Sequence, residues 1–419
     1  MHHVILGNGV AGIEAALAIR ARDDAARITL ISAEHDHFYS RTALMYLLAG
    51  QLSLRDTEPY DRQLYERLRF ERVRGRAERL EAGARKLTVD GRILEFDRLL
   101  LAVGSRARPA PWPGSRGPGV HAFVTLQDLD ALEREVIPGR TACVIGGGLI
   151  GVEVAEALLH RGMKVRFLVR EPWYFPVALD ERESDVVAAH IRTHGVEVRT
   201  RTPVEAIERD GERVTGVRTP DGTVACDLVV VAIGVEPNTG FLRGSDVALA
   251  DNLAIETEPD LSVRGHPHVF AAGDCANVTW ADGVRRPEQL WYTARDQGRV
   301  AGAAMLGDAV RYQRGAWYNS AKFFDLEYTT AGWVPPDPTG WRTWYQQHPT
   351  LPVTQRIVCK GDRVVGFNAV GSRWDHTRIL AWIREHRTLP WVLAHLEEAR
   401  FDEELSPPFR VLPTATLTE

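Results

Sequence analysis

The sequence is poor in cysteine and has no long hydrophobic run. Its four cysteines are Cys143, Cys226, Cys275 and Cys359, and no two of them have the Cys-x-x-Cys or Cys-x4-Cys spacing of a redox disulphide. We therefore expect buried, unreactive thiols and no disulphide chemistry. No apolar run approaches the ~20 residues that span a bilayer, and a strand pattern begins almost at once, which leaves no room for a signal peptide. These absences favour a cytoplasmic protein without membrane contact.

Lysine and metal-ligand clusters are also scarce. The chain has four lysines against 47 arginines and a net charge of −5, a ratio that indicates a GC-rich genome and not nucleic-acid binding. Residues 67–76 alternate arginines with acidic and apolar residues, which is typical of a solvated face, and an acidic redox partner is the weaker alternative. His35 and His37 flank Asp36, but no second cluster accompanies them, so we expect no metal centre.

Two glycine-rich loops dominate what is present. They lie about 140 positions apart, each between an apolar strand pattern and a helical pattern, and they read Gly7-Asn8-Gly9-Val10-Ala11-Gly12 and Gly146-Gly147-Gly148-Leu149-Ile150-Gly151. In such a loop the first glycine permits a tight turn, the second lets the backbone approach a pyrophosphate, and the third lets the helix pack closely on the strand. The helix N-terminus then faces the anion. One chain with both loops can hold two dinucleotides.

The residue that follows the next strand predicts which nucleotide each loop takes. After the first loop, the strand pattern over residues 27–32 ends near Glu34, at about the distance where an acid binds ribose hydroxyls. After the second loop, the pattern over residues 164–169 is followed by Arg170, which can pair with the 2′-phosphate of NADP. The sequence therefore favours NADPH over NADH. Glu171 leaves open the alternative that NADH binds and that Arg170 is a solvated strand end.

Three further segments complete the pattern. Residues 99–105 and 229–234 are buried-strand patterns that end in Ala102-Val103-Gly104 and Gly234, and residues 269–276 contain Gly273-Asp274. With these motifs, nearly the whole chain resembles the flavoproteins with two dinucleotide-binding domains, in the branch of ferredoxin and rubredoxin reductases, nitrite-reductase-type FAD domains and apoptosis-inducing-factor relatives. The resemblance implies FAD at the first loop, NADPH or NADH at the second, and Asp274 on the ribityl chain of the flavin.

Residues 38–50 depart from that branch. They look like its tyrosine-x-arginine-proline-proline-leucine-serine-lysine stretch, which implies that Arg41 and Thr42 point at the pyrophosphate and flavin, but Tyr46 stands in place of the lysine. In the relatives this lysine can pair with the glutamate that matches Glu153, so that ion pair cannot form here. We expect Tyr46 to lie beside the flavin ring or in a helix core. Trp291, at a helix start whose dipole favours negative charge on a reduced flavin, is implied as a flavin neighbour or as core packing.

The order of the motifs predicts an α/β fold with two Rossmann-like three-layer dinucleotide-binding domains and a small C-terminal α+β domain. We expect an FAD-binding domain over residues 1–112 and 240–315, an inserted NAD(P)H-binding domain over 113–239, and the C-terminal domain over 316–419. Residues 356–370 are predicted as two strands joined by a Gly-Asp turn. The tail after Glu404, rich in Pro and Thr, is predicted to be mobile.

The resemblance implies a ferredoxin reductase. Nicotinamide would transfer a hydride to FAD, with Glu153 orienting the carboxamide and Tyr46 and Trp291 tuning the flavin, and a ferredoxin or rubredoxin-like carrier would take the electrons. We expect a monomer or a homodimer. Two alternatives stay open: an NAD(P)H:quinone or oxygen reductase, and a nucleotide-sensing flavoprotein similar to apoptosis-inducing factor.

Overall fold

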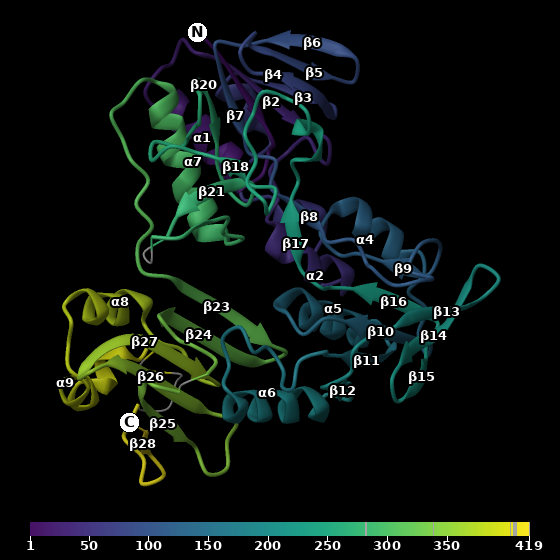
Figure 1. Cartoon of the computed structure of the whole chain (residues 1–419), viewed down its shortest axis with the longest axis vertical. Helices are drawn as coiled ribbons and strands as arrows, with labels where there is room; N and C mark the ends of the chain where they lie inside the picture. Colours follow the sequence, from purple (N-terminus) through teal and green to yellow (C-terminus); the bar gives the residue numbers. More distant parts are fainter. Residues whose placement is uncertain (281–282, 338, 403, 405–408, 419) are drawn as a thin grey trace. The chain divides into compact units, whose positions relative to one another are not determined.

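The chain folds into two compact units (Figure 1). The computed structural model describes residues 1–280, 283–337, 339–402, 404 and 409–418. The first unit comprises Met1–Pro109, Val124–Glu133 and Gly234–Gly315, and the second comprises Ala110–Phe123, Arg134–Ile233 and Ala316–Glu419. The chain therefore leaves the first unit and returns to it twice. The three domain boundaries expected from the sequence remain a prediction.

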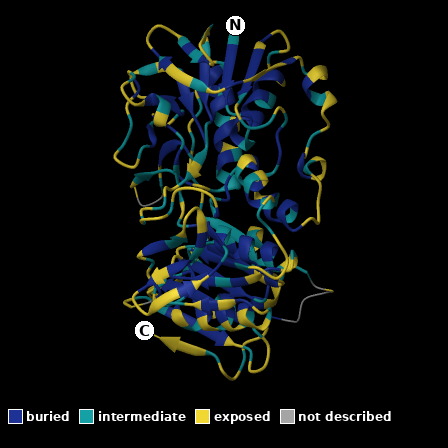
Figure 2. Ribbon diagram, turned by 90° about the vertical axis from the view of Figure 1, so that its right-hand side faces the viewer, coloured by how far each residue is buried: buried dark blue, intermediate teal, exposed yellow. Residues whose placement is uncertain are grey.

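A six-stranded sheet forms the centre of the first unit. Its strands, in spatial order, are β19 (Ser262–Val263), β20 (His266–Ala271), β7 (Arg98–Leu101), β1 (His2–Leu6), β2 (Arg27–Ser32) and β3 (Phe70–Arg74). All neighbours pair in parallel except β19 with β20. The parallel strands are continuous apolar runs because helices and loops cover both faces; they form the dark-blue centre of this unit in Figure 2.

Helices α1 (Val10–Arg20) and α7 (Trp291–Met305) pack closely against each other. Two glycines of α7 make this possible. A Cβ atom on Gly298 would overlap the carbonyl oxygen of Ala11, and one on Gly302 would lie 2.8 Å from the carbonyl oxygen of Ala15. The remaining helical segments of the unit are η1 (Arg41–Ala43), α2 (Leu44–Leu48), η2 (Leu54–Thr57), α3 (Gln63–Arg67), α4 (Leu126–Glu133) and η3 (Gly240–Leu242).

Small sheets complete the first unit. They are β4 (Ala77–Glu81) with β5 (Lys86–Val89) and β6 (Arg92–Glu95), β8 (Ser105–Ala107) with β17 (Val235–Pro237), and β18 (Ile255–Glu256) with β21 (Ala276–Thr279) and β22 (Arg285–Arg286). On the edge strand β3, Phe70 is buried and the next four residues are exposed. The solvated face predicted for residues 67–76 is therefore confirmed there, and charged side chains on an edge strand oppose unwanted strand pairing.

The second unit begins with a five-stranded parallel sheet. Its strands, in spatial order, are β12 (Glu197–Arg199), β11 (Lys164–Leu168), β10 (Thr141–Ile145), β16 (Leu228–Val231) and β9 (Val120–His121). Helices α5 (Leu149–His160) and α6 (Glu181–Thr193) accompany it, together with an antiparallel sheet of β13 (Ala206–Asp210), β14 (Arg213–Thr219) and β15 (Gly222–Ala225). Asp180 and Glu183 form a capping box that fixes the start of α6.

A six-stranded sheet, antiparallel between all neighbours, forms the C-terminal part of the second unit. Its strands, in spatial order, are β23 (Tyr318–Phe323), β24 (Leu326–Gly332), β27 (Arg363–Val370), β26 (Thr354–Lys360), β25 (Arg342–Gln347) and β28 (Thr416–Thr418), with helical segments α8 (His376–Arg384), α9 (Leu389–Ala394) and η4 (Leu396–Ala399). The predicted hairpin over residues 356–370 is confirmed as β26 and β27. Of the tail expected to be mobile, residues 405–408 and 419 lie outside the described residues. That expectation is wrong for Thr416–Thr418, because these residues pair with β25.

A buried ion pair joins this antiparallel sheet to α6. The Arg356 side chain, on β26, is fully buried, and its Nη2 lies 2.8 Å from Oε2 of Glu183. The same guanidinium donates to the carbonyl oxygens of Ala178 and Pro335 at 2.9 and 2.8 Å. A buried charge is tolerated because it is paired and hydrogen-bonded.

The predicted fold class is confirmed. Both parallel sheets carry a strand, glycine loop and helix of the Rossmann type, and an antiparallel sheet with short helices follows. Among the described residues, no helix has the length and apolar character needed to cross a membrane.

Candidate functional site

The first glycine loop forms a tight turn between β1 and α1. Gly7 has φ +113°, and a Cβ atom there would overlap the carbonyl oxygen of Ala102, at the end of β7. A Cβ atom on Gly12 would overlap the carbonyl oxygen of Gly7. Gly7 and Gly12 are therefore required by packing, which brings Ala102 and Val103 beside the loop.

Gly9 has a different role, because a Cβ atom there would meet no atom within 4 Å. Gly9 is the N-cap of α1, its backbone is extended, and neither a side-chain cap nor an acidic residue serves the first turn, where Val10 and Ala11 lie. The first amide groups of a helix need an acceptor. An open space before uncapped amides at the positive end of a helix dipole fits a pyrophosphate.

Asp274 follows β20 and lies beside the first loop. Ser105 Oγ donates a 2.7 Å hydrogen bond to its Oδ2, and the amide of Gly273 donates to Gln297 Oε1 on α7 at 2.8 Å. Burial raises the pKa of Asp274, while the hydrogen bond from Ser105 and the charge of Arg41 oppose that rise. The carboxylate is held in place and can accept a further hydroxyl bond, as the ribityl assignment requires.

Glu34 and Arg41 lie together. Arg41 Nη2 is 2.6 Å from Glu34 Oε2, and Oε1 of Glu34 also accepts from Arg41, from the Tyr39 hydroxyl and, at 2.8 Å, from the amide of Leu126 at the start of α4. Burial alone would raise the pKa of Glu34, but the hydrogen bond and charge of Arg41 lower it. Adenosine ribose would therefore have to take over contacts that protein groups make in this structure. The ribose role of Glu34 stays a prediction.

The aromatic candidates occupy helix positions of the first unit. Trp291 is the first residue of α7, and its indole Nε1–H is buried without a hydrogen-bond partner among the described residues. Three residues later, Ala294 lies against Gly273. A buried orphan donor at the start of the helix that packs on Gly273 fits a polar cofactor atom. Tyr46 is partly buried on α2, whose other four residues are buried, and Thr42 is exposed in η1.

The second glycine loop repeats the geometry of the first. Gly146 has φ +119°, and a Cβ atom there would overlap the carbonyl oxygen of Ala232, while one on Gly151 would overlap that of Gly146. Gly148 is the uncapped N-cap of α5 and faces open space, with Leu149 and Ile150 in the first turn. The same physical argument makes this turn a second pyrophosphate cradle.

The two remaining nucleotide-binding candidates, Arg170 and Gly234, have fewer contacts that fix a role for them. The Arg170 side chain is 79% exposed after β11, and its Nη2 lies 2.8 Å from Glu171 Oε1. Arg170 is therefore free to reach a ligand at the cost of a weak surface pair. Gly234, with φ +101°, belongs to the first unit, where its carbonyl oxygen accepts from the Arg108 amide at 3.0 Å.

Glu153 and Glu156 form a partly buried acidic pair on α5. Burial and the charge of Glu156 raise the pKa of Glu153 to about 7, against a smaller opposing effect of Lys322. Lys322, on β23, pairs with Glu156 at 2.6 Å. The charge of Glu153 also raises the pKa of nearby Tyr174, after the larger effect of burial, and the buried Tyr174 hydroxyl has no partner among the described residues. Glu153 can therefore exchange a proton near neutral pH.

Sequence reasoning missed four contributors to these sites. Ser105 donates a hydrogen bond to Asp274, and the side chain of Gln297 accepts one from the amide of Gly273. Gly298 has no side chain and so allows α7 to pack closely on α1. Lys322 lies 166 positions after Glu156 and binds it on α5. Lys322 had a detectable signal, because it is one of four lysines in the chain and lies in a strand pattern. Residues 38–50 lack the lysine of the relatives, but Lys322, on β23, places a positive charge near Glu153 instead.

The four cysteines are core residues, and two of them, Cys143 and Cys226, lie close enough to hydrogen-bond. All are free and buried. Burial raises the pKa of Cys275 to about 12 and that of Cys359 to about 11, and it also raises the pKa of Cys143. A thiol is nucleophilic only as the thiolate. The predicted burial of the cysteines is confirmed, and their lack of reactivity stays a prediction.

Comparison with known proteins agrees with this geometry. The family model for pyridine nucleotide-disulphide oxidoreductases matches residues 1–298. The ferredoxin–NAD(+) reductase component of the biphenyl dioxygenase system of Paraburkholderia xenovorans is 32% identical over 73% of this chain and 75% of its own. The probable ferredoxin reductase CtmF of Castellaniella defragrans is 30% identical, over 78% and 81%.

A solved structure extends the likeness to the fold. The ferredoxin reductase from Rhodopseudomonas palustris superimposes with a TM-score of 0.80 and 25% identity, covering 88% of this chain and 91% of its own. The family's cofactors fit the two cradles described above. The chain therefore belongs to the pyridine nucleotide-disulphide oxidoreductase family and is an oxidoreductase that binds FAD and NAD(P)H.

Proposed function

We propose that the chain is a ferredoxin reductase, which passes electrons from NAD(P)H through FAD to a ferredoxin-type carrier. The observation that carries this proposal is what the relatives are named: four that are at least 30% identical over 73–78% of this chain are named as ferredoxin reductases. The cysteines support it, because all four are buried, including the neighbouring Cys143 and Cys226, and burial raises the pKa of Cys143. An external acceptor must then receive the electrons.

The residues of the first unit would hold FAD. The α1 N-terminus at Gly9 would bind the pyrophosphate, Asp274 the ribityl chain, and the Trp291 indole a polar atom of the ring. The bound flavin accepts a hydride and releases electrons singly. For such a transfer the protein supplies position and electrostatics more than acid or base groups. Glu34 and Arg41 would exchange their mutual contacts for ribose and phosphate.

Cytochrome c reduction by the FAD-loaded protein tests this function. The assay runs with NADPH or NADH, with and without an added [2Fe–2S] ferredoxin. We expect the rate to rise at least tenfold with ferredoxin. Asp274→Ala should lose FAD, whereas Glu66→Gln, at an exposed site on α3, should retain it and match the parent rate. A rate that does not change when ferredoxin is added would instead favour a quinone or oxygen reductase. Negligible turnover with every acceptor would favour a nucleotide sensor.

Nucleotide preference is a separate part of the proposal. Arg170 is exposed and can reach a 2′-phosphate, so we propose NADPH, although three relatives are named as NAD(+) reductases. Arg170→Ala should raise the KM for NADPH about tenfold and leave that for NADH unchanged. A native preference for NADH would remove Arg170 from this role.

Location and assembly complete the proposal. We place the protein in the cytoplasm, as a monomer or a homodimer. Four unpaired thiols suit a reducing compartment. Light scattering of the FAD-loaded protein measures the assembly directly, and cell fractionation tests the location.

A further inference from the structure

Two histidines of α6 and one aspartate converge in the second unit, away from both glycine loops in the sequence. His190 lies in the last turn of α6 and His194 is its C-cap. Because residues four apart share one face of a helix, both imidazoles project to the same side. Asp325 lies in the two-residue turn between β23 and β24 and completes the group.

The distances within this group match a metal coordination shell. His190 Nε2 and His194 Nε2 lie 2.7 and 2.9 Å from Asp325 Oδ1, and the two nitrogens lie 3.3 Å apart. Zinc binds imidazole nitrogen at about 2.0–2.1 Å, so two ligands of a tetrahedral zinc ion lie about 3.3 Å apart. The two nitrogens have that spacing before any ion is added, and the carboxylate needs to move by only a few tenths of an ångström.

The turn that presents Asp325 is unusual. Phe324 has φ +62°, a left-handed conformation that bulky residues rarely adopt. Its ring stacks on His194, with centroids 4.6 Å apart and an interplanar angle of 20°. Strained backbone persists only where its surroundings hold it and often occurs at a ligand site. Here the stacking aligns His194 and fixes the turn that carries the carboxylate.

Burial and charge also suit an ion. The His190 and His194 side chains are 15% and 32% exposed, while Asp325 is 74% exposed. The imidazoles are thus preorganised, and the solvent side leaves room for ion entry and a water ligand. Among the described residues, Asp325 pairs with these two histidines and with no arginine. In a chain with 47 arginines, a carboxylate that faces only imidazoles remains available to a cation.

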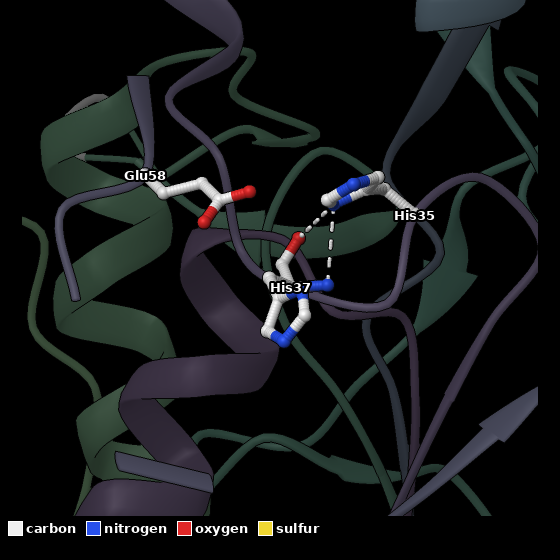
Figure 3. A group of neighbouring side chains, drawn as sticks. All are labelled: His35, His37 and Glu58. Carbon is white, nitrogen blue, oxygen red and sulfur yellow. Dashed lines mark hydrogen bonds between the residues drawn. The ribbon is translucent and has the colours of Figure 1, made fainter. Parts of the chain in front are cut away.

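A second histidine pair serves as a comparison, because it lacks these properties. His35, His37 and Glu58 also approach one another (Figure 3). However, Glu58 already pairs with Arg55 and Arg62 at 2.6 and 2.7 Å, and His35 Nδ1 contacts the main chain of His37 (Figure 3). Arginines at Glu58 neutralise the carboxylate and oppose a cation.

We propose that His190, His194 and Asp325 form a binding site for a divalent transition-metal ion, with zinc as the ion that its two imidazoles and one carboxylate suit. The ion would connect α6 to the β23–β24 turn, and so link the helix beside the parallel sheet to the antiparallel sheet within the second unit. The site has three protein ligands and an open position. It involves neither glycine loop, and it does not depend on the proposed ferredoxin function.

Zinc binding to the FAD-loaded protein tests this inference. After removal of metals with a chelator, equilibrium dialysis against Zn²⁺ should show one ion per chain, and bound zinc should raise the melting temperature. His190→Gln and Asp325→Asn should each weaken binding at least tenfold and abolish the zinc-dependent rise. His160→Gln replaces an exposed histidine at the end of α5 and should behave like the parent, as should His37→Gln.

Three results would overturn the proposal. They are no zinc retained by the parent, binding that survives both His190→Gln and Asp325→Asn, and binding that only His37→Gln removes. Folding of each variant is checked by its flavin content and circular dichroism. If His190→Gln does not fold, Asp325→Asn decides alone, because this exposed turn residue changes by a single atom.

Discussion

Replacing Glu153 by glutamine should make the protein more stable at high pH and leave it unchanged at low pH. Burial and Glu156 raise the pKa of Glu153 from 4.5 to about 7, so the native state holds this proton more tightly than the unfolded chain does. Between pH 4.5 and 7 the native state therefore loses stability relative to the unfolded chain as pH rises, and above pH 7 the full penalty applies. Glutamine has a similar shape and carries no charge, so it avoids that penalty.

The magnitude follows from the same pKa. A difference of one in pKa corresponds to about 1.4 kcal/mol, so the rise to about 7 sets an upper bound of about 3 kcal/mol. Glu153 is only partly buried, and solvent screening reduces this bound to about 2 kcal/mol. We therefore expect Glu153→Gln to raise the free energy of unfolding by about 2 kcal/mol at pH 8 and by much less at pH 4.5.

Urea unfolding followed by tryptophan fluorescence, from pH 4.5 to 8.5, measures this difference. Glu212→Gln, on the exposed β13–β14 turn, is the matched control and should show no pH-dependent gain. Glu156→Gln should lower the pKa of Glu153, because it removes a negative charge and leaves Lys322 to face Glu153 alone. A gain from Glu153→Gln that is equal at all pH values, or a loss at pH 8, would refute the reasoning.

Two further predictions concern packing. Arg356→Met should lower the free energy of unfolding of the second unit by about 3–5 kcal/mol, because it leaves the buried Glu183 charge without a partner; adding Glu183→Gln should recover part of this loss in urea unfolding, and an equal loss in both variants would contradict the ion-pair argument. Gly298→Ala should cost about 1–3 kcal/mol and weaken FAD retention, because the new methyl group overlaps the carbonyl oxygen of Ala11. Gly315→Ala, where a Cβ atom meets nothing within 4 Å, is its control, and identical melting temperatures for the two would contradict the packing argument.

The sequence predicted what depends on local pattern. Both glycine loops, their strands and their helices follow from short-range spacing. The first and last glycines of each loop are needed by a turn or by a contact within the same unit, and the open space at Gly9 and Gly148 suits a ligand. Contacts between distant segments could not be derived in this way. The amide of Leu126 reaches Glu34 across 92 positions, and Lys322 reaches Glu156 across 166.

The same limit explains the remaining differences. Proline and threonine content predicted a mobile tail, but β28 forms because β25 offers an unpaired strand edge, which composition does not reveal. His190 and His194 were visible as an i, i+4 pair, yet their carboxylate partner comes from a turn 131 positions after His194. Only the folded chain brings the three together.

Because all four cysteines are buried, we expect thiol reagents to leave the native protein unlabelled. A single cysteine introduced on the surface would then be the one site that a maleimide probe labels. A series of such positions, each carrying a fluorophore or a photo-crosslinker, would map which face of the protein an electron carrier touches, without first removing any native residue. The binding surface for the partner can therefore be located by site-specific labelling of the otherwise unchanged chain.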